Sequence, residues 1–260
     1  MRKRFRSINS LLVIFLLVVV GGALGINFFA DSAVRMAIDK AGTKALKVPV
    51  DVEKARLSIF AGALGLQDLT VGNPPGYSQT TLLDLSQGAI EINAKSLLSD
   101  EVLIRDIRLD GMKVFVEQKG LDNNLHEVIG ALERDRQPSG RKLVVDHLEI
   151  TNITVLVKLL PIPGQADTVT FKLGTIEMTD LGRHERMDVA MLATKVLLAV
   201  AMGIAKQGGD VLPKEMISGL SNVLDKAIDI GRIIFGNGKN SAEQIGRGIT
   251  EGLKDIVKPK

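Results

Sequence analysis

The chain has 260 residues, of which 45% are hydrophobic and 24% charged, a composition typical of a globular protein with a buried core. It contains no cysteine, which excludes disulfides, thiolate metal sites and cysteine nucleophiles, and its 3% aromatic content leaves few rings to stack on bases or sugars. Four of its 33 basic residues precede the first acidic residue, and the other 29 stand against 30 acidic ones, so we expect no nucleic-acid-binding surface.

The N-terminus predicts a membrane anchor. Residues 1–10 form a basic tail. The 20 residues 11–30 carry no charge, have Asn27 as their only strongly polar side chain, and would span roughly 30 Å as a helix, the thickness of a bilayer core. The basic tail predicts a cytoplasmic N-terminus, with the rest of the chain across the membrane. A cleaved signal peptide is the alternative, but the apolar segment is longer than is usual there and no small-residue cleavage site follows it. Gly21 and Gly25 form a small-residue pair suited to packing two such helices together.

After the anchor, residues 31–47 are interpreted as a membrane-proximal helix or linker and residues 48–182 as a β region. In the β region hydrophobic residues alternate with polar ones over short stretches, which Gly, Pro, Asn and Asp interrupt. Each strand then has one apolar and one polar face, which favours a mostly antiparallel sheet.

Two segments of the β region resemble each other. Residues 107–117 align without gaps on residues 148–158, which lie 41 positions later. In both segments the hydrophobic alternation changes parity at the centre, at Gly111 and at Asn152, residue types that tolerate a left-handed backbone. This favours a repeated strand unit with a bulge at its centre, although any sheet of similar strands produces echoes of this kind.

Helices are predicted in two places. Near residues 122–135, three polar residues that can cap a helix precede apolar residues at helical spacing, and we expect this short helix to lie across the sheet. After residue 182 the spacing becomes helical, so residues 183–260 are interpreted as a helical C-terminal region. Residues 189–205 are strongly apolar but short for a second membrane span, which favours a buried or membrane-surface helix.

The sequence gives no indication of catalysis. His126, His147 and His184 lack the spacing of metal ligands, and the patterns of nucleophile elbows, phosphate-binding loops and dinucleotide-binding turns do not occur. We therefore expect a non-enzymatic protein with no catalytic residue, no metal site and no cofactor.

A series of motifs points to a family. Behind the predicted anchor come residues 57–62, residues 66–77 with the turn Asn73-Pro-Pro-Gly-Tyr77, residues 90–98, residues 104–117 and residues 123–125. This order resembles the N-terminal module of AsmA-like proteins of the Gram-negative envelope, over roughly residues 5–135 and more weakly to about residue 182.

The resemblance implies a single-pass protein of the bacterial inner membrane, with its N-terminus in the cytoplasm and its bulk in the periplasm. It also implies a role in outer-membrane biogenesis or lipid homeostasis, because larger members are thought to carry phospholipid in a curled β groove. A sheet of roughly eight to ten strands is about 40 to 45 Å wide, too narrow to bridge the envelope alone.

The expected fold is therefore α+β: an N-terminal transmembrane helix, a curled and mostly antiparallel sheet with a short helix across it, and a C-terminal helical region. Ten aliphatic residues are candidates for contact with acyl chains, and they would equally form an ordinary core if helices cover them: Ile90, Ile92, Ile107, Leu109, Val114, Val116, Leu148, Ile150, Val155 and Val157. The expected partners are the membrane, phospholipid and other envelope proteins or a second copy. The alternative function is a scaffold that binds another envelope protein and carries no lipid.

Overall fold

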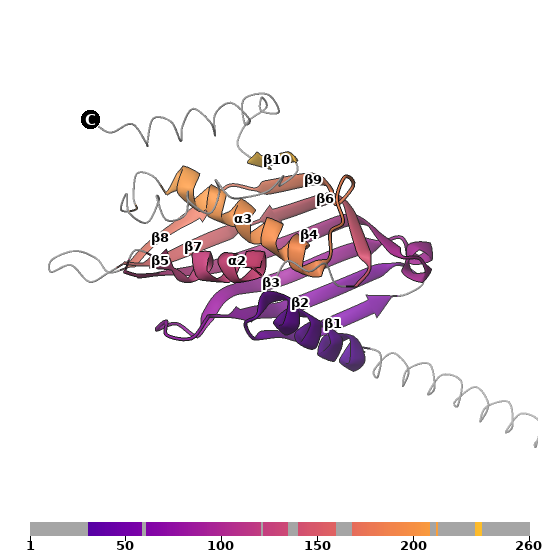
Figure 1. Ribbon diagram of the computed structural model, residues 1–260, viewed down its shortest axis with the longest axis horizontal. Helices are drawn as coiled ribbons and strands as arrows, with labels where there is room; N and C mark the ends of the chain where they lie inside the picture. Colours follow the sequence, from indigo (N-terminus) through magenta and orange to yellow (C-terminus); the bar gives the residue numbers. More distant parts are fainter. Residues whose placement is uncertain are drawn as a thin grey trace, which may run out of the picture.

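A computed structural model describes residues 31–58, 61–120, 122–134, 140–159, 168–208, 212 and 232–235, with only the backbone of residues 133 and 232–235. The predicted anchor with Gly21 and Gly25, and most of the C-terminal region after residue 208, lie outside the described residues. The described part is a mixed α+β fold built mainly of sheet, in agreement with the coarse expectation (Figure 1).

Residues 31–46 are helical and precede the first strand. The elements that follow, in chain order, are β1 (Val50–Ser58), β2 (Ala63–Gly72), β3 (Thr81–Ile92), the 3-10 turn η1 (Ala94–Leu98), β4 (Glu101–Lys119), β5 (Asp122–Asn123), α2 (Asn124–Arg134), β6 (Lys142–Thr151), β7 (Ile153–Lys158), β8 (Thr168–Leu173), β9 (Ile176–Leu181), α3 (Val189–Gln207) and β10 (Arg232–Phe235).

The strands form one open sheet in the order β1-β2-β3-β4-β6-β9-β10. β5 and β7 also pair with β4, and β8 pairs with β7. Most neighbours are antiparallel, as expected, but the long β4 pairs in parallel with β6 and β7. The expected curling is wrong, because the sheet is open and does not curl into a groove, and β1 and β10 lie at opposite ends of the strand order (Figure 1).

The edge at β1 is capped by four polar side chains of the helix over residues 31–46. They recur every four residues and so lie on one helix face. Their bonds to the β1 backbone are as follows: Asp31 Oδ1 accepts from the Leu57 N–H at 3.3 Å, Arg35 donates to the Glu53 carbonyl at 3.5 Å, Asp39 Oδ1 accepts from the Val52 N–H at 3.0 Å, and Thr43 Oγ1 accepts from the Val50 N–H at 2.9 Å. Since a bare edge can template pairing with another chain, these bonds also protect the sheet from extension.

The two repeated segments lie side by side in the sheet. Ile107 pairs with Leu148 and Val114 with Val155, so the parallel register equals the 41-residue offset of the repeat. Gly111 and Asn152 have φ values of 72° and 53°, the left-handed backbone that their residue types predict. Both strands change the parity of their hydrophobic alternation at these neighbouring positions. The hydrophobic residues before and after Gly111 and Asn152 therefore stay on one face of the sheet.

α2 forms where the sequence predicts it, in the connection between the parallel strands. Asn123 caps it by accepting from the His126 N–H at 2.9 Å, and Leu125, Val128 and Ile129 are buried in the core. α3 contacts both α2 and the sheet, so residues 189–207 are a packed helix rather than a separate segment. β10 was not expected within the predicted helical region, but its sequence Arg-Ile-Ile-Phe is rich in strand-forming residues, and it pairs with β9.

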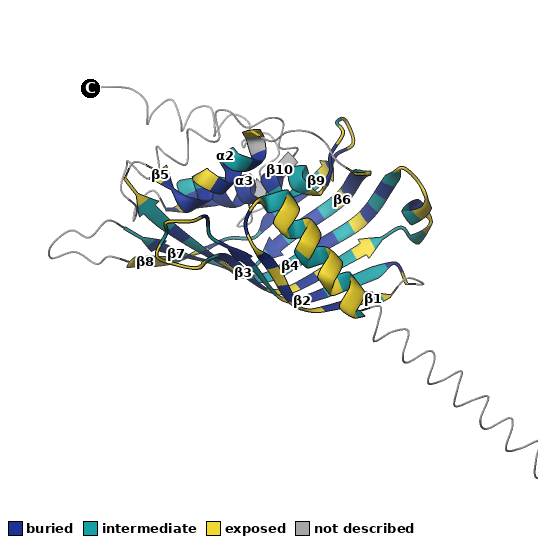
Figure 2. Cartoon of the chain, turned by 60° about the horizontal axis from the view of Figure 1, so that its bottom comes forward, coloured by how far each residue is buried: buried dark blue, intermediate teal, exposed yellow. Residues whose placement is uncertain are grey.

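The helices lie on one face of the sheet, and the opposite face carries many exposed residues (Figure 2). The main core joins the sheet to α2 and α3. A smaller cluster of Val52, Ala55 and Leu66 packs against Val34 and Ile38 of the N-terminal helix.

Buried Asn124 joins the turn after β2 to β4 and α2. Its amide donates to Asn73 Oδ1 and to the Phe115 carbonyl, both at 2.7 Å, and its Oδ1 accepts from the N–H groups of Glu117 and Leu125 at 2.9 and 3.0 Å. Asn73 is the first residue of the Asn-Pro-Pro-Gly-Tyr turn, which is one of the motifs that resemble AsmA-like proteins. This motif therefore has a structural role in the fold.

We expect Asn124→Ala to lower the free energy of unfolding by roughly 2 to 4 kcal/mol, because it leaves buried backbone groups without partners. Asn93→Ala is the matched control, since Asn93 caps η1 at a more exposed position and its loss should cost about 1 kcal/mol. Urea unfolding of the solubilised full chain measures both, and equal effects would contradict this role of Asn124.

Candidate functional site

The structure separates the ten candidate lipid-contacting residues into two groups. Seven are at most 4% exposed and lie in the core cluster that includes the apolar residues of α2 and α3: Ile107, Val114, Val116, Leu148, Ile150, Val155 and Val157. Of the two readings left open by the sequence, this placement corresponds to an ordinary core, because packed side chains rather than solvent surround these seven.

The other three candidates, Ile90, Ile92 and Leu109, are only partly buried. Together with Leu64 and Leu69 they form a half-buried apolar surface, which we call the helix-side strip. Leu69 and Ile90 pack against both core clusters, so the strip lies between the part of the sheet under the N-terminal helix and the part under α2 and α3.

The strand register places the strip residues beside one another. Ile90 pairs with Leu64 on β2 and with Ile107 on β4, while Leu109 pairs with Gly88. Gly88 lacks a side chain at this point, and a Cβ added there would lie 3.4 Å from Leu66 Cβ and 3.6 Å from Leu109 Cδ2. These are ordinary contact distances, so a small side chain fits at position 88 and a larger one would occupy space over the strip.

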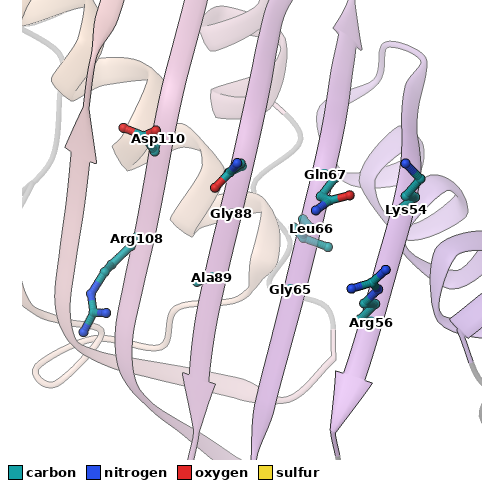
Figure 3. Close-up of a pocket in the computed structure, with 10 residues that line it drawn as sticks. Lys54, Arg56, Gly65, Leu66, Gln67, Gly88, Ala89, Arg108 and Asp110 are labelled. Carbon is teal, nitrogen blue, oxygen red and sulfur yellow. The ribbon is translucent and has the colours of Figure 1, made fainter.

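The opposite face of the sheet carries a shallow hollow of about 450 Å³ over β1 to β4 (Figure 3). Its floor includes Gly65, where an added Cβ would meet no atom within 4 Å. Its polar and charged lining residues are Lys54, Arg56, Gln67, Gln87, Arg108 and Asp110. Arg108 also pairs with Asp106 at 2.7 Å from Nε to Oδ2, so its charge is partly balanced within the sheet. This hollow combines charged groups with a largely apolar lining, whereas the helix-side strip is aliphatic throughout.

The predicted absence of catalytic residues remains a prediction. His147 Nδ1 lies 2.6 Å from Asp106 Oδ1, His126 pairs with Asp122, and His184 is exposed. Among the residues that the structure describes, no group of three or more His, Asp or Glu side chains could hold a metal ion.

One helix of the described part, α3, is long and apolar enough to cross a membrane by length and composition. Half of its most apolar window is buried inside the protein, where it packs against the sheet. The apolar composition of α3 is therefore explained by core packing.

Two parts of this arrangement were missed in the sequence. The sequence does contain a signal for the edge-capping side chains, because polar residues recur there at four-residue intervals: Asp31, Arg35, Asp39 and Thr43. For Leu64 and Leu69, the only signal in the sequence is the hydrophobic alternation of β2. They are half-buried because they lie in a gap between the helices, and that gap depends on tertiary packing.

Comparisons with known proteins found no matching family model, no matching curated protein and no matching solved structure. The AsmA-like assignment therefore stays a prediction from the motifs of the sequence.

The turn that follows β2 is held by Glu117 of β4. The Glu117 carboxylate accepts from the N–H groups of Ser78 and Gln79 and from the Ser78 hydroxyl, at 2.9 to 3.1 Å. Partial burial opposes ionisation of Glu117, but these hydrogen bonds and the charge of Lys158 outweigh burial and lower its pKa below the ordinary value.

This lowered pKa predicts a pH dependence of stability. Because the folded-state pKa lies below that of the unfolded chain, ionised Glu117 stabilises the fold above about pH 4.5, and this contribution is lost as the pH falls through the folded-state pKa. In urea unfolding, the stability difference between the natural chain and Glu117→Gln should shrink between about pH 6 and pH 3. Glu53→Gln controls for the loss of one negative charge, and a Glu117→Gln difference that stays constant with pH would contradict the assignment.

Proposed function

We propose that the chain is a non-enzymatic, AsmA-like protein anchored in the inner membrane of a Gram-negative bacterium, where it supports outer-membrane biogenesis or lipid homeostasis. The motif order supports the family, and the apolar residues 11–30 behind a basic tail support a single-pass anchor with a periplasmic ectodomain. In this proposal the ectodomain holds a phospholipid acyl chain along the helix-side strip.

The half-buried state of the strip is the observation that carries this proposal. Its five residues are aliphatic, and a ligand that covers them gains roughly 25 cal/mol for each Å² of apolar surface removed from water. Residues 88–92 of β3 extend about 13 Å along the strand, which leaves room for part of one acyl chain. Since the seven buried candidates lie under α2 and α3, the proposed contact is a narrow strip rather than a broad groove.

A scaffold without lipid is the second candidate, and two observations favour it. The main core is covered by the protein's own helices, and the opposite sheet face offers another protein a hollow with the charged residues Lys54, Arg56 and Arg108. The two functions differ in which molecule contacts each face of β3 in the cell.

Crosslinking in living bacteria tests this difference. A photoreactive amino acid such as p-benzoylphenylalanine replaces Ile90 in one full-length variant and Ala89 in the other. Adjacent residues of a strand point to opposite faces, so Ala89 is the matched control on the hollow side. We expect a phospholipid adduct at position 90, detected by mass spectrometry, and little at position 89. No lipid adduct at position 90 would contradict lipid holding, and a protein adduct at position 89, on the side of the hollow, would favour the scaffold.

A second variant fills the strip without introducing charge. Gly88→Val suits a strand and adds methyl groups between Leu66 and Leu109, so we expect it to lower the lipid adduct at position 90 severalfold while the chain stays folded. Ala89→Val makes a similar change on the other face and should leave the adduct unchanged. Equal adduct levels in the two variants would contradict the placement of the acyl chain.

A further inference from the structure

Two of the three exposed large hydrophobic residues of the described part lie at one end of the sheet. The three are Met36, Leu98 and Val189, which are 56%, 94% and 52% exposed. Leu98 belongs to η1, which follows the end of β3. Met36 lies farther along β1, because its neighbour Arg35 bonds to Glu53 in the middle of that strand. Val189 begins α3 just after Met187, whose carbonyl accepts from Leu143 N–H at the start of β6. Two elements that are distant in sequence, η1 and the start of α3, therefore present apolar side chains at the same end.

Leu98 is exposed on a turn that is firmly held. The Ser96 hydroxyl donates to the Asn93 carbonyl at 2.6 Å and accepts from the Leu103 N–H at 2.9 Å. The Ser99 hydroxyl donates to the Ser96 carbonyl at 2.9 Å, and Arg141 donates to the carbonyls of Leu97 and Ser99. These bonds fix the backbone on both sides of Leu98, so its exposure is built into the turn.

Basic side chains accompany Leu98 at this end. Lys95 is exposed on the same turn, and Arg141 and Arg186 are exposed on the neighbouring segments. The acidic residues Asp100 and Glu101 also lie here, and Glu101 pairs with Lys142 at 2.8 Å. An exposed leucine flanked by cations is the combination that favours the interface of an anionic membrane.

The course of the chain indicates which surface this end meets. Residue 31 directly follows the apolar segment 11–30, and the edge-capping bonds tie the helix over residues 31–46 to β1. A bilayer spanned by residues 11–30 would therefore lie next to the end that carries Asp31 and η1. The turn between β2 and β3 is at the other end, about 40 Å away along β3.

We propose that this end of the ectodomain docks on the periplasmic surface of the lipid bilayer, with Leu98 inserted into the interface and Lys95 and Arg141 beside anionic headgroups. The inference rests on the anchor of the proposed function and adds a second, separate membrane contact. Ile92 of the helix-side strip is three residues before Lys95, so docking would bring one end of the strip to the lipid.

Fluorescence quenching tests the docking in the full chain. The natural chain has no cysteine, so Leu98→Cys and Gln79→Cys each give one site for a bimane label. Both proteins are reconstituted into phosphatidylethanolamine and phosphatidylglycerol vesicles whose acyl chains are brominated close to the headgroup. We expect bromine to quench the label at position 98 severalfold more than the label at position 79, which lies in the exposed turn between β2 and β3. Equal quenching at the two positions would overturn the docking.

Flotation of the same samples separates the two proposals. The anchor predicts that both labelled chains float with the vesicles after an alkaline carbonate wash. Floating chains with an unquenched label at position 98 would refute the docking alone, whereas chains that do not float would refute the anchor and the docking together. A third variant, Val189→Cys, should be quenched more than Gln79→Cys if the whole end meets the membrane.

Discussion

The hydrogen bonds between the N-terminal helix and the edge of β1 are the constraint on which the rest of the arrangement depends. Four side chains at four-residue spacing, from Asp31 to Thr43, occupy backbone groups that an edge strand would otherwise offer to another chain. The same bonds hold the helix beside the sheet, where Val34 and Ile38 cover Val52 and its neighbours. The position of this helix therefore has two consequences. It blocks the β1 edge of the sheet from pairing with another chain, and it bounds one side of the helix-side strip.

The other side of the strip is set by the parallel pairing of β4 with β6 and β7. Such a pairing requires a crossover connection, and here that connection contains α2. α2 and α3 together bury the sheet around Val114, Leu148 and Val155. The strip around Ile90 and Leu109 is what remains half-exposed between two helical covers, which explains why only three of the ten candidate residues lie there.

Local patterns in the sequence predicted much of this fold. The 41-residue repeat, the left-handed backbone at Gly111 and Asn152, and the capped helix after residue 122 are all encoded by nearby residues. The parallel direction of the repeated strands, the open shape of the sheet and the strand at residues 232–235 depend on pairing between distant segments, which alternation alone does not reveal. For the same reason the sequence named Ile90, Ile92 and Leu109 but could not separate them from Val114 or Ile150, which have the same strand pattern and are buried by α2 and α3.

We propose that a single anchor places this sheet in the periplasm, with the N-terminus in the cytoplasm. Cysteine labelling tests it directly, because Ser7→Cys and Gln79→Cys each introduce the only thiol of the full chain. In intact spheroplasts, a membrane-impermeant maleimide should label Gln79→Cys at once and Ser7→Cys only after lysis. Labelling of Ser7→Cys in intact spheroplasts, or protection of Gln79→Cys until lysis, would contradict the account.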